Sequence, residues 1–218
     1  MKKTALFFLM LCMGSALTLK AQNTDVSGID NVLYITPFSV EPGTTEFELK
    51  VCMKNTAEIR GLQFDLYLPE GASIAFNEKG KFVNVPKFNE GRLPEDDEHT
   101  IQGKKQTDGA IRFLINSEYS ETFTGNDGLL FTVKVALEAT MAQGEYPIVM
   151  KNIKLSESDI STFYLTEEVK TTMTYGTPTA IKSISASKQT KGIYNVAGQQ
   201  VEMQKGINIV DGKKVMVK

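Results

Sequence analysis

Tryptophan is absent from the 218-residue chain, and histidine occurs once, as His99. A single histidine excludes metal-dependent hydrolysis by paired histidines, and it leaves any nucleophile-and-base site dependent on His99 alone. Glycine-rich phosphate-binding motifs are also missing. Carboxylate pairs that hydrolyse glycosides cannot be recognised from sequence spacing. An enzyme therefore stays as the least favoured of the three functions named at the end of this section. We expect a non-catalytic protein.

Long apolar stretches are confined to the N-terminus. Two lysines precede the run ALFFLMLCMGSAL, which is shorter than the roughly 20 residues that span a bilayer. A small residue, Ala21, offers a cleavage point before Gln22, so residues 1–21 are predicted to be a secretory signal peptide. A lipoprotein signal at Cys12 is the alternative, but Met-Leu rather than a small residue precedes that cysteine. We expect the mature chain to be exported and to contain no transmembrane helix.

Cysteine is nearly absent from the mature chain, where Cys52 alone remains. One cysteine cannot form an internal disulfide, so an apolar core must stabilise the fold. Cys52 is either a reactive or intermolecular thiol or an ordinary strand residue, and we favour the strand residue.

Charge of one sign predominates in the larger part of the chain. Residues 22–187 carry 24 acidic against 15 basic side chains, a net charge of −9. Residues 188–218 carry six lysines against two acidic residues, a net charge of +4. The acidic part argues against nucleic acid or an anionic membrane as partner, because phosphates would be repelled. The basic end is predicted to be a separate unit.

Alternation of apolar and polar residues dominates the sequence that is present. EFELKVCMKN shows the two-residue period of a half-buried strand. The segments GLQFDLYLPEG, AIRFLINS, GLLFTVKVALEA, GEYPIVMKNIKL and TFYLTEEVKTTMTY show the same period. In the last segment, Phe163, Leu165 and Val169 are predicted to face inward and Tyr164 outward.

No segment after the signal shows a long helical apolar stripe. Seven or more alternating strands require two sheets packed face to face. The sequence therefore predicts an all-β antiparallel β-sandwich of jelly-roll topology over residues 22–175. The polar stretch 176–190 is predicted to be a linker, and residues 191–218 a short β tail whose pieces are separated by glycines.

The segment Asn77–Gly109 lacks the strand pattern and is rich in glycine, proline and charge. A connection this long is usually functional or mobile. Its run PEDDEHT places Asp96, Asp97 and Glu98 beside His99. These residues are metal candidates because carboxylates are ligands for Ca²⁺. A solvated acidic loop is the alternative that we favour, and we expect no cofactor.

Ligand candidates are few. Tyr67, Tyr119 and Tyr164 are aromatic residues predicted to lie on outward or loop positions, where a ring can stack on a sugar. Edge packing or cross-strand pairing is the alternative for each. Asp127 in TGNDGLL is a candidate loop ligand, although Asn-Asp-Gly is first of all a turn signal.

Several strand motifs in order resemble one family. PGTTEFELKVCMKN, IRGLQFDLYLPEGASI, DGAIRFLINS, GNDGLLFTVKVAL and GEYPIVMKNIKLS are together similar to cohesin-like domains of the carbohydrate-binding β-sandwich superfamily. The resemblance covers about residues 30–175. It implies a nine-strand jelly roll and a non-catalytic role in binding a protein module or a glycan. The Asn77–Gly109 segment is longer than the family's connection there, and no calcium repeat of the dockerin type occurs.

The C-terminal segment resembles a second family. IYNVAGQQV followed by KGINIVDGKKVMVK is similar to the C-terminal sorting domains of the bacterial type IX secretion system. The resemblance implies that the secretion machinery is a partner of the tail; a tail that only packs locally is the alternative. The matching positions are Asn195, Gly198, Val201, Gly206, Gly212 and Lys218.

Three functions follow from these patterns. The first is a binding module for a glycan or a partner protein, secreted or held at a bacterial cell surface, in the periplasm or on the outer-membrane exterior. The second is a structural, adhesin-like surface subunit without a small-molecule ligand. The third is the enzyme hypothesis given above. No nucleic acid is expected as partner.

Overall fold

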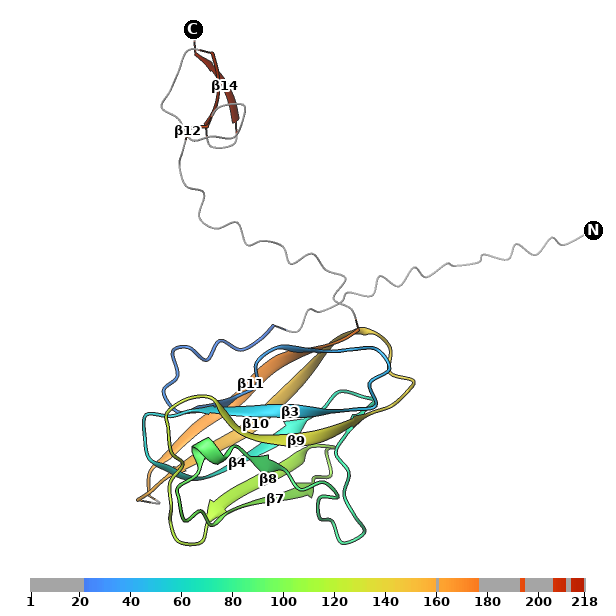
Figure 1. Cartoon of the computed structure of the whole chain (residues 1–218), viewed down its shortest axis with the longest axis vertical. Helices are drawn as coiled ribbons and strands as arrows, with labels where there is room; N and C mark the ends of the chain where they lie inside the picture. Colours follow the sequence, from blue (N-terminus) through green and yellow to red (C-terminus); the bar gives the residue numbers. More distant parts are fainter. Residues whose placement is uncertain (1–21, 160, 177–192, 195–205, 211–212, 218) are drawn as a thin grey trace, which may run out of the picture. The chain divides into compact units, whose positions relative to one another are not determined.

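The computed structural model describes residues 22–159, 161–176, 193–194, 206–210 and 213–217. The chain divides into two compact units, one ending at Thr177 and one beginning at Pro178, and both are drawn in Figure 1. We call the described part of the first unit the body. The signal peptide with Ala21 and the linker from residue 177 on lie outside the described residues. So do five of the six tail-motif positions: Asn195, Gly198, Val201, Gly212 and Lys218.

The body is a sandwich of two β-sheets packed face to face, as predicted (Figure 1). One sheet has five strands in the order β1-β3-β9-β5, with β6 also paired to β9. Its strands are β1 (Val32–Tyr34), β3 (Glu46–Lys54), β9 (Leu129–Leu137), β5 (Ala72–Ser73) and β6 (Lys87–Phe88).

The second sheet has six strands in the order β2-β11-β10-β4-β8-β7. Its pairs are antiparallel except for β2 and β11, which run parallel. The strands are β2 (Phe38–Val40), β11 (Phe163–Tyr175), β10 (Gly144–Glu157), β4 (Ile59–Tyr67), β8 (Ile111–Ser117) and β7 (His99–Lys105).

The core lies between the two sheets and is built by the alternation that the sequence shows. Phe64 and Phe113 stack at its centre with ring centroids 4.9 Å apart, and Phe131 reaches them from the opposite sheet. Buried apolar area of this kind is the main favourable contribution to folding. The inward residues of four strands are Leu49, Val51 and Met53; Leu62, Phe64 and Leu66; Ile111, Phe113 and Ile115; and Phe131, Val133, Val135 and Leu137.

The predicted orientation of the first half of β11 is wrong. Phe163 pairs with Ser156 and Leu165 with Lys154, and all four lie on the solvent side of the sheet, whereas Tyr164 pairs with the buried Leu155. The alternation of inward and outward side chains shifts by one residue near Asn152. This residue has a positive φ of 52° and lies at an irregularity in the pairing of β10 with β4. A one-residue slip exchanges the two faces of a strand.

The Asn77–Gly109 segment is anchored to the body rather than free. Phe82 packs on Phe113 and lies over Gly103 of β7, where a Cβ atom would overlap the Phe82 ring. Arg92, which ends a 3₁₀ turn over Glu90–Arg92, is 3 % exposed and points into the body. The segment also supplies β6 and β7, so it completes both sheets.

The tail forms a three-stranded antiparallel sheet of β12 (Ile193–Tyr194), β13 (Gly206–Val210) and β14 (Lys213–Val217). Gly206 is the first residue of β13 and pairs with Val217 of β14. Within the residues that the structure describes, no helix has the length and apolarity required to cross a membrane.

Candidate functional site

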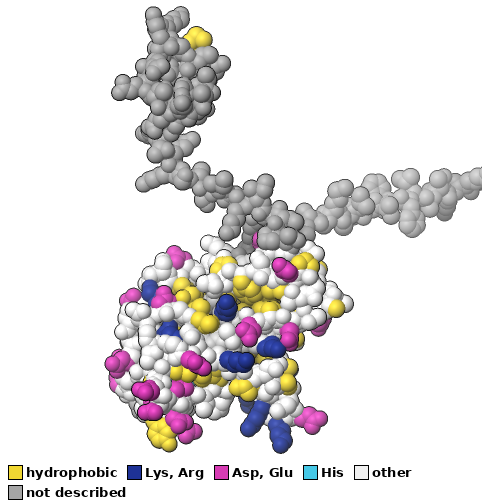
Figure 2. All heavy atoms as spheres, in the orientation of Figure 1, with side chains coloured by type: hydrophobic (Ala, Val, Ile, Leu, Met, Phe, Trp, Pro, Cys, Tyr) yellow, Lys and Arg dark blue, Asp and Glu magenta, His cyan; other side chains and the backbone are white. Residues whose placement is uncertain are grey.

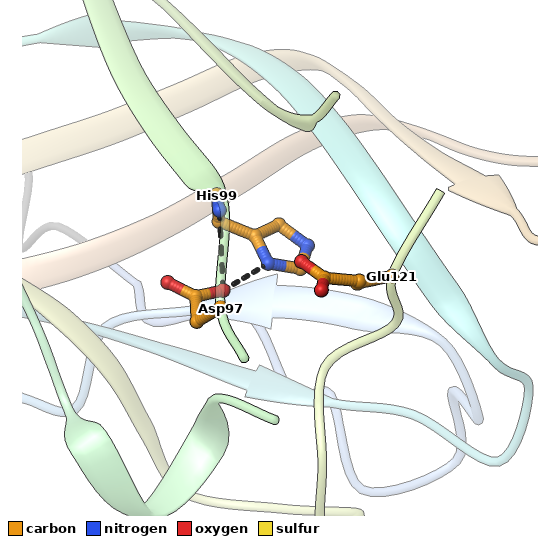
Figure 3. A group of neighbouring side chains, drawn as sticks. All are labelled: Asp97, His99 and Glu121. Carbon is orange, nitrogen blue, oxygen red and sulfur yellow. Dashed lines mark hydrogen bonds and ion pairs between the residues drawn. The ribbon is translucent and has the colours of Figure 1, made fainter. Parts of the chain in front are cut away.

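Three chemically reactive side chains converge at one end of the β7–β8 pair. Asp97 and His99 stand at the start of β7, and Glu121 follows the end of β8. Residues His99 and Ser117 are direct partners in the ladder, which brings the two connecting segments together. One ligand atom of each of the three side chains lies within 4.8 Å of the others, and the carboxylates reach His99 from separate segments (Figure 3).

The His99 imidazole is buried, and both of its nitrogens face oxygen atoms. Nδ1 lies 2.5 Å from Oδ1 of Asp97, and Nε2 lies 3.1 Å from the backbone carbonyl of Arg60. The ring stacks on Phe123 at 4.1 Å between centroids, and its side chain has no exposed area. A carbonyl can only accept, so Nε2 carries a proton and donates it to Arg60.

The Glu121 carboxylate is positioned by hydrogen bonds. Oε2 accepts the backbone N–H of Glu98 at 2.8 Å and the hydroxyl of Ser117 at 3.1 Å. In turn, the Ser117 Oγ accepts the backbone N–H groups of Tyr119 and Glu121. The connection after β8 is therefore fixed around Glu121.

These contacts do not form a nucleophile-and-base pair. The base nitrogen of such a pair must face a hydroxyl or thiol, whereas Nε2 of His99 faces a backbone carbonyl. Of the three predicted metal candidates, the structure brings Asp97 into the cluster, while Asp96 and Glu98 are exposed beside it. Glu121 was missed by the sequence reasoning because it is distant in sequence; pairing of β7 with β8 is the signal that would have found it.

The predicted tyrosine candidates do not come together. Tyr67 points outward, as predicted, but its hydroxyl donates to Asp108 at 2.7 Å and the Lys151 ammonium lies over its ring. Tyr119 is 73 % exposed at the end of β8. Tyr164 lies on the core side, contrary to the prediction, and donates its hydroxyl to Glu157. A sugar platform of aligned rings is not formed by these three residues.

Asp127 has a local role that agrees with the turn interpretation. Its Oδ1 accepts the backbone N–H of Gly128 and the hydroxyl of Tyr34, both at 2.7 Å. Burial, followed by the bond to Asp127, raises the pKa of Tyr34. Cys52 beside it is a buried strand residue whose thiol pKa is raised chiefly by burial, which does not favour a reactive thiol.

The solvent side of the six-stranded sheet carries a surface that the sequence did not reveal. We call it the outer face. Its residues form three rows across β7, β8, β4, β10 and β11 that follow from the strand registers. The rows are Gln102, Leu114, Gln63, Lys154 and Leu165; Thr100, Asn116, Gly61, Ser156 and Phe163; and Lys104, Arg112, Asp65, Lys151 and Glu168.

Large apolar side chains are exposed on this outer face. Leu165 is 74 % exposed, Leu114 43 % and Phe163 42 %. A groove of about 260 Å³ crosses the face and is lined in part by Leu114, Phe163 and Gly61. Gly61 contributes no side chain to the groove, and an added Cβ would lie 2.9 Å from the carbonyl oxygen of Ile115. The Lys154 ammonium lies 3.6 Å from the centre of the Phe163 ring.

One charged network stiffens the outer face. Asp65 is buried and accepts two hydrogen bonds from the Arg112 guanidinium, at 2.7 and 2.8 Å, and one from Asn152 at 2.8 Å. The bonds from Arg112 hold the pKa of Asp65 below its usual value. Bidentate pairs of this kind have a well-defined geometry, so the centre of the face is preorganised.

Comparisons with known proteins give a fold but not a family. No protein-family model and no curated protein matches the chain. Among solved structures, a chain in a complex of the cohesin CaCohA2 with a dockerin has 11% identity and a TM-score of 0.52, over 66% of this chain and 97% of that chain. A chain in a cohesin OlpA–dockerin complex from Clostridium thermocellum has 16% identity and a TM-score of 0.51, over 66% and 98%. The body therefore has a cohesin-like fold.

Proposed function

We propose that the chain is an exported, non-catalytic module that binds a partner protein through the outer face of its six-stranded sheet. The observation that carries this proposal is the set of exposed apolar side chains Leu114, Phe163 and Leu165 beside the groove, on a fold that occurs in cohesin–dockerin complexes. Exposed apolar patches on soluble domains commonly mark interaction sites. The rigid strands below the patch hold its residues in place without further ordering on binding.

Charge indicates what kind of partner surface fits. Four cations, Lys104, Arg112, Lys151 and Lys154, stand on the outer face against the two anions Asp65 and Glu168. The rest of the body is acidic, and Figure 2 shows acidic, basic and apolar side chains interspersed on one of its faces. A partner with an apolar centre and an acidic rim is complementary to this face.

The two alternatives from the sequence are less well supported. A glycan surface requires accessible aromatic faces, and Tyr67 is covered by Lys151 whereas Tyr119 stands alone. An assembly subunit would pair through the edge strand β7, which ends in Lys104 and Lys105. Lysines on an edge oppose strand addition. Export by the signal peptide, and sorting by the tail at a bacterial surface, complete the proposal.

The test uses the immobilised chain to capture proteins from the surface and medium of the cells that make it. We expect a captured partner to lose at least about ten-fold in affinity for Leu114→Asp and Leu165→Asp, since a charge in a desolvated contact is costly. Val83→Asp is the matched control, because Val83 is an exposed apolar residue outside the outer face. Equal capture by all three variants, or binding only on a glycan array, would contradict the proposal.

A further inference from the structure

We infer that Asp97, His99 and Glu121 form a binding site for a divalent transition-metal cation of the chemistry of Zn²⁺. Imidazole nitrogen and two carboxylates are donors that such cations accept. Asp97 and His99 come from the start of β7, and Glu121 comes from the segment after β8, so the third donor lies outside the acidic run. The inference does not depend on the partner that the outer face binds.

Nδ1 of His99 is the ring nitrogen that a metal would bind, in place of its hydrogen bond with Asp97. Because Nε2 donates to the Arg60 carbonyl, Nδ1 is the nitrogen that faces Asp97. A metal-bound histidine usually donates its other N–H to a carbonyl or carboxylate, which orients the ring. Nδ1 and Oδ1 of Asp97 lie 2.5 Å apart in a hydrogen bond, and a cation bound to both atoms would replace that bond.

Hydrogen bonds hold the Asp97 and Glu121 carboxylates next to His99. Asp97 Oδ1 also accepts the backbone N–H of His99 at 3.1 Å, and Glu121 Oε2 is held by the Glu98 N–H and the Ser117 hydroxyl. Both carboxylates are partly exposed, so a cation can enter from solvent. The buried imidazole forms the inner wall. The donors are therefore held in place by hydrogen bonds and burial, while the side with the two carboxylates is accessible to solvent.

The spacing suits a small cation after modest side-chain rotation. Ligand bonds of about 2.0–2.2 Å place the donors on a tetrahedral Zn²⁺ roughly 3.4 Å apart. The donors here lie within 4.8 Å of one another. Ca²⁺ fits less well, because it takes about 6–8 oxygen ligands and one of these three donors is nitrogen. Three protein ligands leave a fourth position for water or for a donor from a partner.

A bound cation would join the segment before β7 to the segment after β8. The Arg60 carbonyl connects His99 to β4, and Arg60 also lines the groove of the outer face. Metal binding should therefore stiffen one end of that groove as well as raise the stability of the body.

Calorimetric titration of the tag-free chain with ZnCl₂, and separately with CaCl₂, tests the inference. We expect one Zn²⁺ per chain and no comparable binding of Ca²⁺. Asp97→Asn and Glu121→Gln should each weaken Zn²⁺ by more than about ten-fold, since even second-sphere changes cost about 10–100-fold. Asp96→Asn and Glu98→Gln are matched controls, because these exposed carboxylates flank Asp97 without belonging to the cluster.

The single histidine makes a direct spectroscopic readout available. His99 gives the only imidazole signals of the chain, so ¹⁵N spectra should show Zn²⁺ at Nδ1 with the proton retained on Nε2. This measurement on the wild-type chain decides the question even if a variant fails to fold. Unchanged His99 signals in millimolar Zn²⁺, or equal losses in the control and cluster variants, would overturn the inference.

Discussion

Replacement of Arg92 by methionine should destabilise the body strongly, although Arg92 lies in the segment with the least regular sequence. Its guanidinium donates to the carbonyl oxygen of Thr124 at 2.5 Å, to that of Met53 at 3.0 Å and to Oδ1 of Asn55 at 2.6 Å. No carboxylate accepts from it among the described residues, and burial lowers its pKa. Arg92 thus fastens the connection after β6 to the end of β3.

The magnitude follows from two opposing terms. Each hydrogen bond from a charged donor contributes about 1.5–3 kcal/mol, and the buried cation costs several kcal/mol in lost hydration. We expect the free energy of unfolding to fall by about 3 kcal/mol, because three acceptors lose their donor and methionine only fills the space. For a domain of this size the melting temperature should fall by roughly 6–12 °C.

Urea unfolding followed by circular dichroism measures this change. Lys87→Met is the matched control, because Lys87 is an exposed cation on the neighbouring β6; its effect should stay within about 0.5 kcal/mol. A loss below about 1 kcal/mol for Arg92→Met would show that the three contacts do not hold the connection.

Three further predictions concern the body. Asp65→Asn should destabilise it at neutral pH, and the difference from wild type should shrink below about pH 4 in urea titrations, because a carboxyl with a depressed pKa contributes stability only while it is ionised. A difference that persists at low pH would contradict this. Gly103→Ala should lower the free energy of unfolding by about 1–3 kcal/mol, because the added Cβ displaces Phe82. Gly28→Ala should change it little, because no atom lies near that position. Equal melting temperatures for the two variants would contradict the close contact of Phe82 with Gly103. Deletion of residues 177–218 should leave the melting temperature of the body unchanged, and a large drop would assign the tail to the fold.

Strand faces could be predicted wherever the alternation is unbroken. Leu62, Phe64 and Leu66 are buried as expected because nothing interrupts the two-residue period of β4. Tyr164 and Leu165 were assigned to the wrong faces, because the irregularity near Asn152 shifts the phase of the adjoining strands. The shift is visible in β10, where the buried Met150 and Ile153 are three residues apart, but not in β11, where the apolar Leu165 and Val169 keep an even spacing.

The candidate sites were harder to predict for the same reason. Asp97 was selected from its acidic run, but Glu121 reaches it only because β7, hidden in a polar segment, pairs with β8. The outer face is assembled from strands distant in sequence, so the shared exposure of Leu114, Phe163 and Leu165 on it appears only when the registers are known. Arg92 could not be distinguished from a surface cation, since its acceptors are mainly backbone carbonyls.

The outer face of the six-stranded sheet is the surface that we propose binds a partner protein. Methyl NMR of the leucine-labelled chain with the captured partner tests it most directly, because Leu114 and Leu165 stand on that face while Leu137 is buried beneath the other sheet. Binding at the outer face should shift or broaden the Leu114 and Leu165 signals and leave the Leu137 signal unchanged. Unchanged Leu114 and Leu165 signals in a saturated complex would contradict it.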